Sequence, residues 1–178
     1  MPILIGSIST SKERSFGALL APYLASPKTL FIISSDFCHW GTRFSYTFFQ
    51  PPHATHSAAL PAGYKLSRAT QPADLPHPIH KSIALLDRTG MDAIQFSAKA
   101  RKTPSQAHEE FAQYLVETKN TICGRHPIGV LLGALAKLEG EKGWASTRLE
   151  WVRYERSSLV ETVGDSSVSY ASAFVTTL

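Results

Sequence analysis

Cysteine is scarce in this sequence. The 178 residues include only Cys38 and Cys123, which lie far apart along the chain. A small disulfide-stabilised scaffold needs several cysteines at short spacings, so this class of protein is excluded.

Long hydrophobic runs are also missing. The longest, IGVLLGALA at 128–136, is far shorter than the roughly 20 apolar residues that cross a bilayer. The start, MPILIGSIST, lacks the basic segment and cleavage pattern of a secretory signal. We therefore expect a soluble cytoplasmic protein without membrane insertion, with the nucleus as an alternative location.

Neither charge sign is concentrated in one part of the chain. The formal net charge is +4, and the basic residues are scattered rather than gathered in a run. A nucleic-acid-binding protein concentrates its basic residues on one face, so we expect no nucleic-acid partner. The hydrophobic fraction of 43% and the chain length suit a single globular domain over residues 1–178.

Two common catalytic motifs are absent. The sequence contains no G-x-S-x-G and no G-x-G-x-x-G, so a serine hydrolase and a Rossmann oxidoreductase have no support. The turn before residue 127 also lacks the Gly-Lys-Ser/Thr ending of a phosphate-binding P-loop.

The first 36 residues alternate between apolar runs and a helical pattern. Residues 2–8 and 27–36 predict buried strands, and residues 9–24 predict a helix between them. This order is typical of a parallel sheet covered by helices. The predicted fold class is therefore α/β, with a mixed or parallel sheet flanked by helices.

The apolar stripe of the first helix predicts which side faces the core. Its members are Phe16, Leu19, Leu20 and Tyr23. Lys12, Glu13 and Arg14 are expected to face water.

The remaining chain predicts an insertion, three helices and two strands. Residues 50–78 are rich in Pro, Ala, Ser and Thr and indicate a mobile surface insertion. Helices are expected at 79–90 with Gly90 at its end, at 104–120 with His108 in solvent, and at 127–143. Strands are expected at 147–156 and 166–178.

The stretch FIISSDFCHWG at 31–41 places reactive side chains at the end of an apolar strand. Asp36 and His39 are three residues apart, so one turn of backbone brings them to the same side. Aspartate and histidine side chains can bind Fe, Zn or Cu, and His39 can equally act as a general acid or base. The alternative is a strand end in which Asp36 caps the next turn and His39 is simply hydrogen-bonded.

The stretch NTICGRHPIGVL at 120–131 places Cys123 just before a predicted helix and close to Arg125. Positive charge and a helix N-terminus both favour the thiolate form of a cysteine, as suits a metal ligand or a redox thiol. A small buried cysteine in a helix-entry turn is the alternative.

Two histidine pairs, His53/His56 and His77/His80, have the H-x-x-H spacing that can hold a metal on a helix. Three of the four lie in the proline-rich segment, where no helix is expected. We therefore interpret both pairs as incidental.

Taken together, these stretches resemble one protein family. LFIISSDFCHWGTRFSYTFF, NTICGRHPIGVLL and DSSVSYASA resemble the Memo family, mediators of ErbB-driven cell motility with prokaryotic relatives in the AmmeMemoRadiSam system. The resemblance covers nearly all of the chain outside residues 50–78. Family members are nearly twice this long, and the chain resembles their C-terminal part.

The resemblance implies a fold and a metal pocket. Family members are structurally similar to class III extradiol dioxygenases, α/β proteins built around a non-haem iron pocket. By this resemblance Asp36 and His39 line the pocket, and Cys123 is a ligand for Fe(II) or Cu. Neighbouring wall residues are Ser35, Trp40, Arg125 and His126. Two further histidines of the family site lie in the part not matched by this chain, so the site is expected to be incomplete here.

The resemblance also implies a function. We expect a signalling or scaffold protein that binds iron or copper, is linked to cell motility and the cytoskeleton, and recognises a protein or peptide partner. The alternatives are a non-haem iron oxidase or dioxygenase with His39 as acid/base, and a fragment without activity of its own. The oligomeric state stays open.

Overall fold

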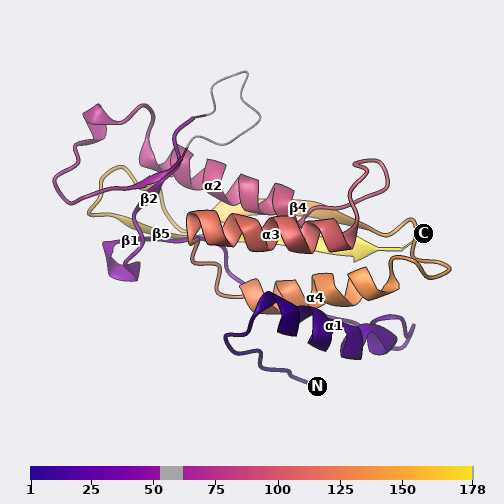
Figure 1. Ribbon diagram of the computed structural model, residues 1–178. Coiled ribbons are helices and arrows are strands. Elements are labelled where there is room, and N and C mark those ends of the chain that lie inside the picture. Colours follow the sequence, from indigo (N-terminus) through magenta and orange to yellow (C-terminus); the bar gives the residue numbers. More distant parts are fainter. Residues whose placement is uncertain (53–61, 178) are drawn as a thin grey trace.

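Helices and short strands make up the regular structure of the computed structural model, which describes residues 1–52 and 62–177 (Figure 1). The helices of these residues are α1 (Thr10–Leu24), α2 (Ile79–Ile94), α3 (Pro104–Thr118) and α4 (Arg125–Leu138), with 3-10 turns at Thr42–Phe44 and Pro72–Asp74. The strands are β1 (His39–Gly41), β2 (Phe48–Phe49), β3 (Tyr64–Lys65), β4 (Arg148–Arg156) and β5 (Ser166–Thr176).

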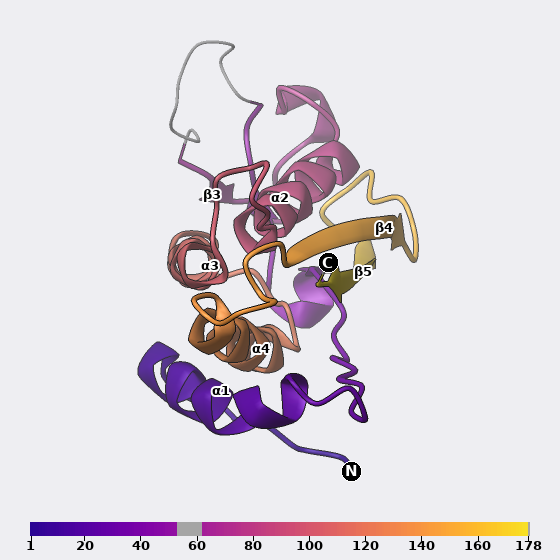
Figure 2. The ribbon, with the colours of Figure 1, turned by 90° about the vertical axis from the view of Figure 1, so that its right-hand side faces the viewer.

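The four helices lie in one layer, in the order α1, α4, α3, α2. Figure 2 shows this layer on one side of the β4–β5 ribbon. Local capping fixes where two of the helices begin: the Ser9 side chain accepts the Lys12 N–H at α1, and Thr103 and Gln106 form a reciprocal capping box at α3. Within the described residues, no helix has the length and apolar character that crossing a membrane requires.

The sheet is antiparallel. Its strand order is β1-β5-β4, and β2 pairs with β3 separately. Strand β5 pairs with β4 along most of its length, whereas β1 covers only Ser166–Val168 on the other side. Two further backbone hydrogen bonds join Phe37 and Cys38 to Ser169. Beyond Ser169, β5 therefore has one free edge among the described residues.

The α/β class is confirmed, but the expectation of parallel strands is wrong for the described residues. Helix α1 forms as predicted, whereas the flanking segments 2–8 and 27–36 are not strands. Leu4 is 98% exposed and Ile32 is 82% exposed. A strand needs a hydrogen-bonded neighbour, and neither segment has one here.

The predicted orientation of α1 is also wrong. Phe16, Leu19 and Tyr23 are exposed, while Glu13, Gly17 and Ala21 are buried against α4. Glycine permits this contact, because a Cβ at Gly17 would overlap the α4 backbone. Small residues let the two helix backbones approach closely, and this close contact decides which face of α1 is inside.

His108 is buried, not solvated as predicted. Its side chain is 1% exposed and its Nε2 lies 3.0 Å from Glu13 Oε2. Arg14 Nε donates to His108 Nδ1 at 3.2 Å, so the Nε2 carries the proton that Glu13 accepts. His126 Nδ1 lies 2.7 Å from the other Glu13 oxygen. One carboxylate thus joins α1 to both α3 and α4.

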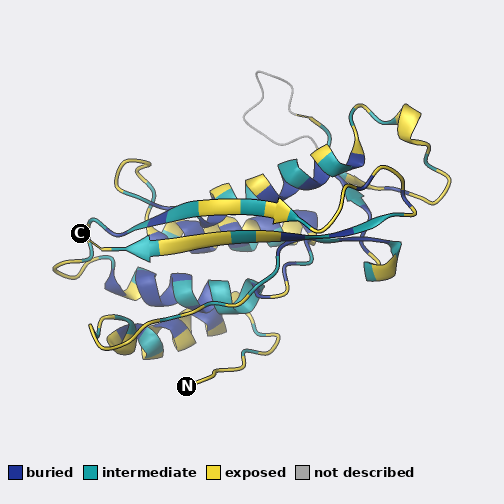
Figure 3. Cartoon of the chain, turned by 180° about the vertical axis from the view of Figure 1, so that it is seen from behind, coloured by how far each residue is buried: buried dark blue, intermediate teal, exposed yellow. Residues whose placement is uncertain are grey.

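Several element boundaries differ from the predicted ones. Helix α2 continues through Gly90 to Ile94, and Gly90 packs against the Tyr114 ring instead of ending the helix. Helix α4 begins at Arg125, two residues earlier than expected. The C-terminal strands form as predicted, and Figure 3 shows long exposed stretches on their outer face. Of the predicted insertion 50–78, residues 53–61 lie outside the described part.

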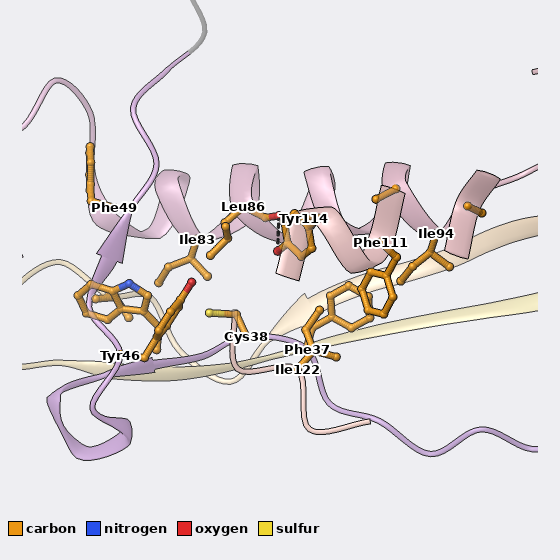
Figure 4. Packing of buried hydrophobic residues seen from close by; sticks show 14 of the residues in the cluster. Phe37, Cys38, Tyr46, Phe49, Ile83, Leu86, Ile94, Phe111, Tyr114 and Ile122 are labelled. Atoms are coloured by element: carbon orange, nitrogen blue, oxygen red, sulfur yellow. Dashed lines mark hydrogen bonds between the residues drawn. The ribbon is translucent and has the colours of Figure 1, made fainter. Parts of the chain in front are cut away.

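The main core lies between the helix layer and the sheet. Figure 4 shows Phe37, Cys38 and Ile122 on one side of this core, facing Ile83, Leu86 and Phe111 on the helices. The Cys38 side chain is fully buried, and burial raises the pKa of its thiol well above the usual value. Cys38 therefore acts as a small core residue.

Glu13→Gln should lower the free energy of unfolding by about 1–3 kcal/mol, because an amide has one acceptor oxygen where the carboxylate has two and a buried histidine N–H loses its partner. The pKa of Glu13 supports this role: burial alone would raise it, but the hydrogen bonds to His108 and His126 hold it below its ordinary value. Urea denaturation would measure the difference. Glu141→Gln, at an exposed position, is the matched control, and an equal effect of both substitutions would contradict the prediction.

Candidate functional site

The structure brings Asp36, His39 and Cys123 together. One oxygen, one nitrogen and one sulfur donor from these side chains all lie within 4.8 Å of one another. Asp36 Oδ2 and His39 Nε2 are 3.5 Å apart. Among the described residues, this is the only group of three or more such side chains that could hold a metal ion.

A single hydroxyl holds the His39 backbone in place. Thr121 Oγ1 accepts the His39 N–H at 2.8 Å and donates to the His39 carbonyl at 3.0 Å. Both backbone groups of His39 are therefore satisfied by the residue two positions before Cys123. This contact joins the entrance of β1 to the turn that precedes α4.

A second contact aligns Asp36 with Cys123. The Asp36 N–H donates to Cys123 Sγ at 3.2 Å, and the Gly124 N–H donates to Ser35 Oγ at 3.0 Å. A Cβ at Gly124 would overlap the Ser35 side chain, so glycine is required for this close approach. Cys123 directly precedes Gly124, the N-cap of α4, and its sulfur therefore receives both a backbone N–H and the positive end of a helix.

The donor set fits a first-row transition metal. His39 Nε2 is buried and has no hydrogen-bond partner, although it lies beside a carboxylate and a thiol. A buried ring nitrogen without a hydrogen bond is unfavourable unless another group binds it, and Asp36 Oδ2 at 3.5 Å is near enough only for an ion pair with a protonated ring. Imidazole, carboxylate and thiolate together suit Fe, Cu or Zn rather than Mg or Ca. Asp36 and Cys123 remain accessible to solvent, which leaves a route for the ion.

The buried carboxylate of Asp87 is linked by hydrogen bonds to Thr121, the residue that positions His39. Asp87 accepts hydrogen bonds from Tyr154 O–H at 2.8 Å and from Asn120 Nδ2 at 3.3 Å. Asn120 Oδ1 in turn accepts the Thr121 N–H at 2.7 Å. The network links α2 and β4 to the residue that positions His39. Burial raises the pKa of Asp87, and these hydrogen bonds only partly offset the effect.

Sequence reasoning missed Asp87 and Asn120. The available signal was an acidic residue on an apolar helical stripe, since Asp87 follows Ile79, Ile83 and Leu86 on the buried side of α2. A buried carboxylate at such a position requires polar partners.

The predicted wall residues lie in different surroundings. Ser35 contacts the Cys123 turn as described. Trp40 is fully buried, and its indole N–H donates to the Phe48 carbonyl at 2.8 Å. Arg125 is half-buried and reaches the Ile122 carbonyl. His126, on α4, points away from the three donors to Glu13 on α1. Ser35 is thus the wall residue that directly supports the three donor side chains.

The histidine pairs contribute no ligand group in the described part of the chain. His77 Nε2 lies 3.0 Å from the Gln50 carbonyl, and its ring packs edge-on against Phe49. His80 lies in the first turn of α2. His53 and His56 lie outside the described residues.

Comparisons with known proteins agree on one family. The family model described as Memo-like protein matches residues 1–174. The chain is 37% identical over 179 residues to MEMO1 family protein MHO1 of Saccharomyces cerevisiae, covering 98% of this chain and 51% of the relative. It is 40% identical over 171 residues to Protein MEMO1 of Xenopus tropicalis (96% and 46% covered) and 38% identical over 176 residues to Protein MEMO1 of Homo sapiens (99% and 48% covered). The chain spans about half the length of the curated relatives it matches.

Asp87→Asn should make the stability of the protein less sensitive to pH. Because burial raises the pKa of Asp87 in the folded state, the folded protein binds this proton more tightly than the unfolded chain does. The Asp87 contribution to stability is therefore full below the ordinary value of 3.8 and is lost as pH rises towards the folded pKa. The stability difference between wild type and variant should be largest at about pH 4 and smaller at about pH 7.

Urea denaturation between about pH 4 and about pH 7 would measure this stability difference between wild type and Asp87→Asn. Asp74→Asn, on the exposed 72–74 turn, is the matched control. If the stability advantage of wild type over Asp87→Asn grew with pH, the raised pKa of Asp87 in the folded state would be contradicted.

Proposed function

The chain belongs to the Memo-like protein family, and we propose that it binds one iron or copper ion between Asp36, His39 and Cys123. The observation that carries this proposal is the convergence of three chemically different donors around a buried histidine nitrogen that has no hydrogen-bond partner. Three protein ligands with an open side are typical of reactive rather than purely structural metal sites.

Each residue has a defined part in this proposal. Asp36 and His39 supply oxygen and nitrogen ligands, and Thr121 holds the His39 backbone so that the imidazole stays directed at Asp36. Cys123 supplies sulfur, and the Asp36 N–H stabilises negative charge on it. A bound iron or copper ion supplies Lewis acidity and a one-electron redox couple at this surface.

The cellular role that we propose follows from the family resemblance. We infer a cytoplasmic signalling or scaffold protein, linked to cell motility and the cytoskeleton, in which the metal site controls a protein or peptide interaction. The partial exposure of Asp36 and Cys123 supports this role, because a partner or a redox reagent can reach the site directly.

A non-haem iron oxidase or dioxygenase is the second candidate. The proximity of Asp36 and His39 favours it, since this pair can move a proton at the open side of the site. Loading the protein with Fe(II) without oxygen and then adding catechol and O₂ separates the candidates. Ring-cleaved product would establish the enzyme, whereas stoichiometric metal binding without product supports the signalling role.

Cys123→Ser should weaken Fe(II) or Cu binding by about 100-fold or more. Losing an outer-shell partner already lowers metal affinity by about 10–100-fold, and loss of a ligand should have at least this effect. Metal titration followed by elemental analysis measures the affinity and the stoichiometry. Loss of the thiolate-to-metal absorption band would identify sulfur as the ligand.

Cys38→Ala is the matched control for this experiment, because it removes the other thiol of the chain from the core. It should leave metal stoichiometry unchanged. The ligand assignment is rejected if Cys123→Ser binds metal as tightly as the wild type does.

A further inference from the structure

Asp87 interacts with both of the segments that carry the donor side chains, residues 36–39 and residues 120–123. It is fully buried on α2. Asn120 Nδ2, from the second segment, donates to Asp87 Oδ1 at 3.3 Å. The backbone N–H of Cys38, from the first segment, also stabilises negative charge on this carboxylate. Because α2 belongs to neither segment, Asp87 can hold the two against each other.

The polar groups that face Asp87 are hydrogen-bond donors. Burial raises the pKa of this carboxyl, and donation by Ser169, Tyr154, Asn120 and Cys38 offsets part of that rise. An ionised carboxylate only accepts hydrogen bonds, so it matches donors on several sides at once. Any neutral side chain at this position offers fewer acceptors to the two segments.

The orientation of the Asn120 amide depends on these contacts. Its Nδ2 donates to Asp87 and lies 2.6 Å from the Tyr114 hydroxyl oxygen, which is free to accept because the Tyr114 O–H donates to the Leu86 carbonyl (Figure 4). The amide oxygen therefore faces the other way and accepts the Thr121 N–H at 2.7 Å. A reversed amide would place two donors, Asn120 Nδ2 and the Thr121 N–H, against each other.

Core packing alone does not require a carboxylate at position 87. The neighbouring buried positions Ile83 and Leu86 on α2 are apolar. Replacing buried charged groups by apolar side chains of similar volume is often neutral or stabilising. The contacts of Asp87 with the two donor-bearing segments therefore give this carboxylate a role that an apolar side chain could not fill.

We propose that Asp87 is a positioning residue of the metal site, which acts through Asn120 to fix the place of His39. The Asn120 oxygen holds the Thr121 backbone, and the Thr121 hydroxyl holds both backbone groups of His39. This inference rests on the proposed function, because it assigns a role at the same site. Asp87 itself contacts no metal in this proposal.

The test begins with Asp87→Leu, which removes both acceptor oxygens and keeps a similar side-chain volume. Fe(II) binding, measured by titration without oxygen, should weaken by about tenfold or more, since loss of an outer-shell partner lowers metal affinity by about 10–100-fold. In the metal-free protein, hydrogen exchange at the amides of His39 and Thr121 should become at least about tenfold faster, because their hydrogen bonds open more often.

Glu13→Gln is the matched control, because Glu13 is the other buried carboxylate with several hydrogen bonds and joins α1 to α3 and α4. It contacts neither residues 36–39 nor residues 120–123. This variant should lose stability while Fe(II) affinity and the exchange rates at His39 and Thr121 stay as in the wild type. A purely structural role of Asp87 would give both variants the same Fe(II) affinity.

A reciprocal exchange of side chains tests the same contact in a second way. Asn120→Asp alone places two carboxylates side by side and removes the donor to Asp87, so Fe(II) binding should weaken. Adding Asp87→Asn restores a donor–acceptor pair with its direction reversed, and residue 120 keeps an oxygen for the Thr121 N–H. The double variant should bind Fe(II) about threefold or more tightly than Asn120→Asp, as expected for coupled neighbours. This comparison does not depend on whether Asp87→Leu folds.

Two results overturn the positioning role. One is an equal Fe(II) affinity of Asp87→Leu and Glu13→Gln, and the other is a double variant that binds no better than Asn120→Asp. A wild-type chain that binds no Fe(II) would contradict the proposed function instead. The exchange rates of the metal-free protein then test the positioning role by themselves, and unchanged rates at His39 and Thr121 in Asp87→Leu would overturn it.

Discussion

The two hydrogen bonds between the Thr121 hydroxyl and the backbone of His39 are the contact on which the candidate site depends. They fix the entrance of β1 against the turn before α4, two segments separated by 82 residues in sequence. Asp36 and Cys123 are brought together by the same alignment, which the Gly124 N–H reinforces through Ser35. This contact therefore brings Cys123 to the pair that Asp36 and His39 already form through their three-residue spacing.

Buried carboxylates hold the surrounding elements in register. Asp87 joins α2 to β4 and, through Asn120, to Thr121. Glu13 joins α1 to α3 and α4 through two histidines. Apolar packing alone tolerates small shifts between helices, whereas a carboxylate with several hydrogen bonds accepts only one arrangement. The stability of the helix layer and the geometry of the site are therefore coupled.

The elements with strong local signals could be predicted from the sequence. The four helices and the two C-terminal strands follow from apolar periodicity and caps, and the three-residue spacing accounts for the proximity of Asp36 and His39. That segments 2–8 and 27–36 are not strands here could not be predicted, because strand formation depends on a neighbouring strand rather than on the segments themselves. The burial of Glu13 and His108 depends on a contact across 95 residues. The resemblance assigned Cys123 to the same pocket as Asp36 and His39, and ligation by these residues stays a prediction.

X-ray absorption spectroscopy of the iron- or copper-loaded protein tests the central claim most directly. The account predicts one sulfur neighbour from Cys123 together with nitrogen and oxygen neighbours that include an imidazole, at one metal per chain. A first shell made only of nitrogen and oxygen would contradict it. Such a result would show that the contact between the two segments has a structural role and that the metal binds elsewhere.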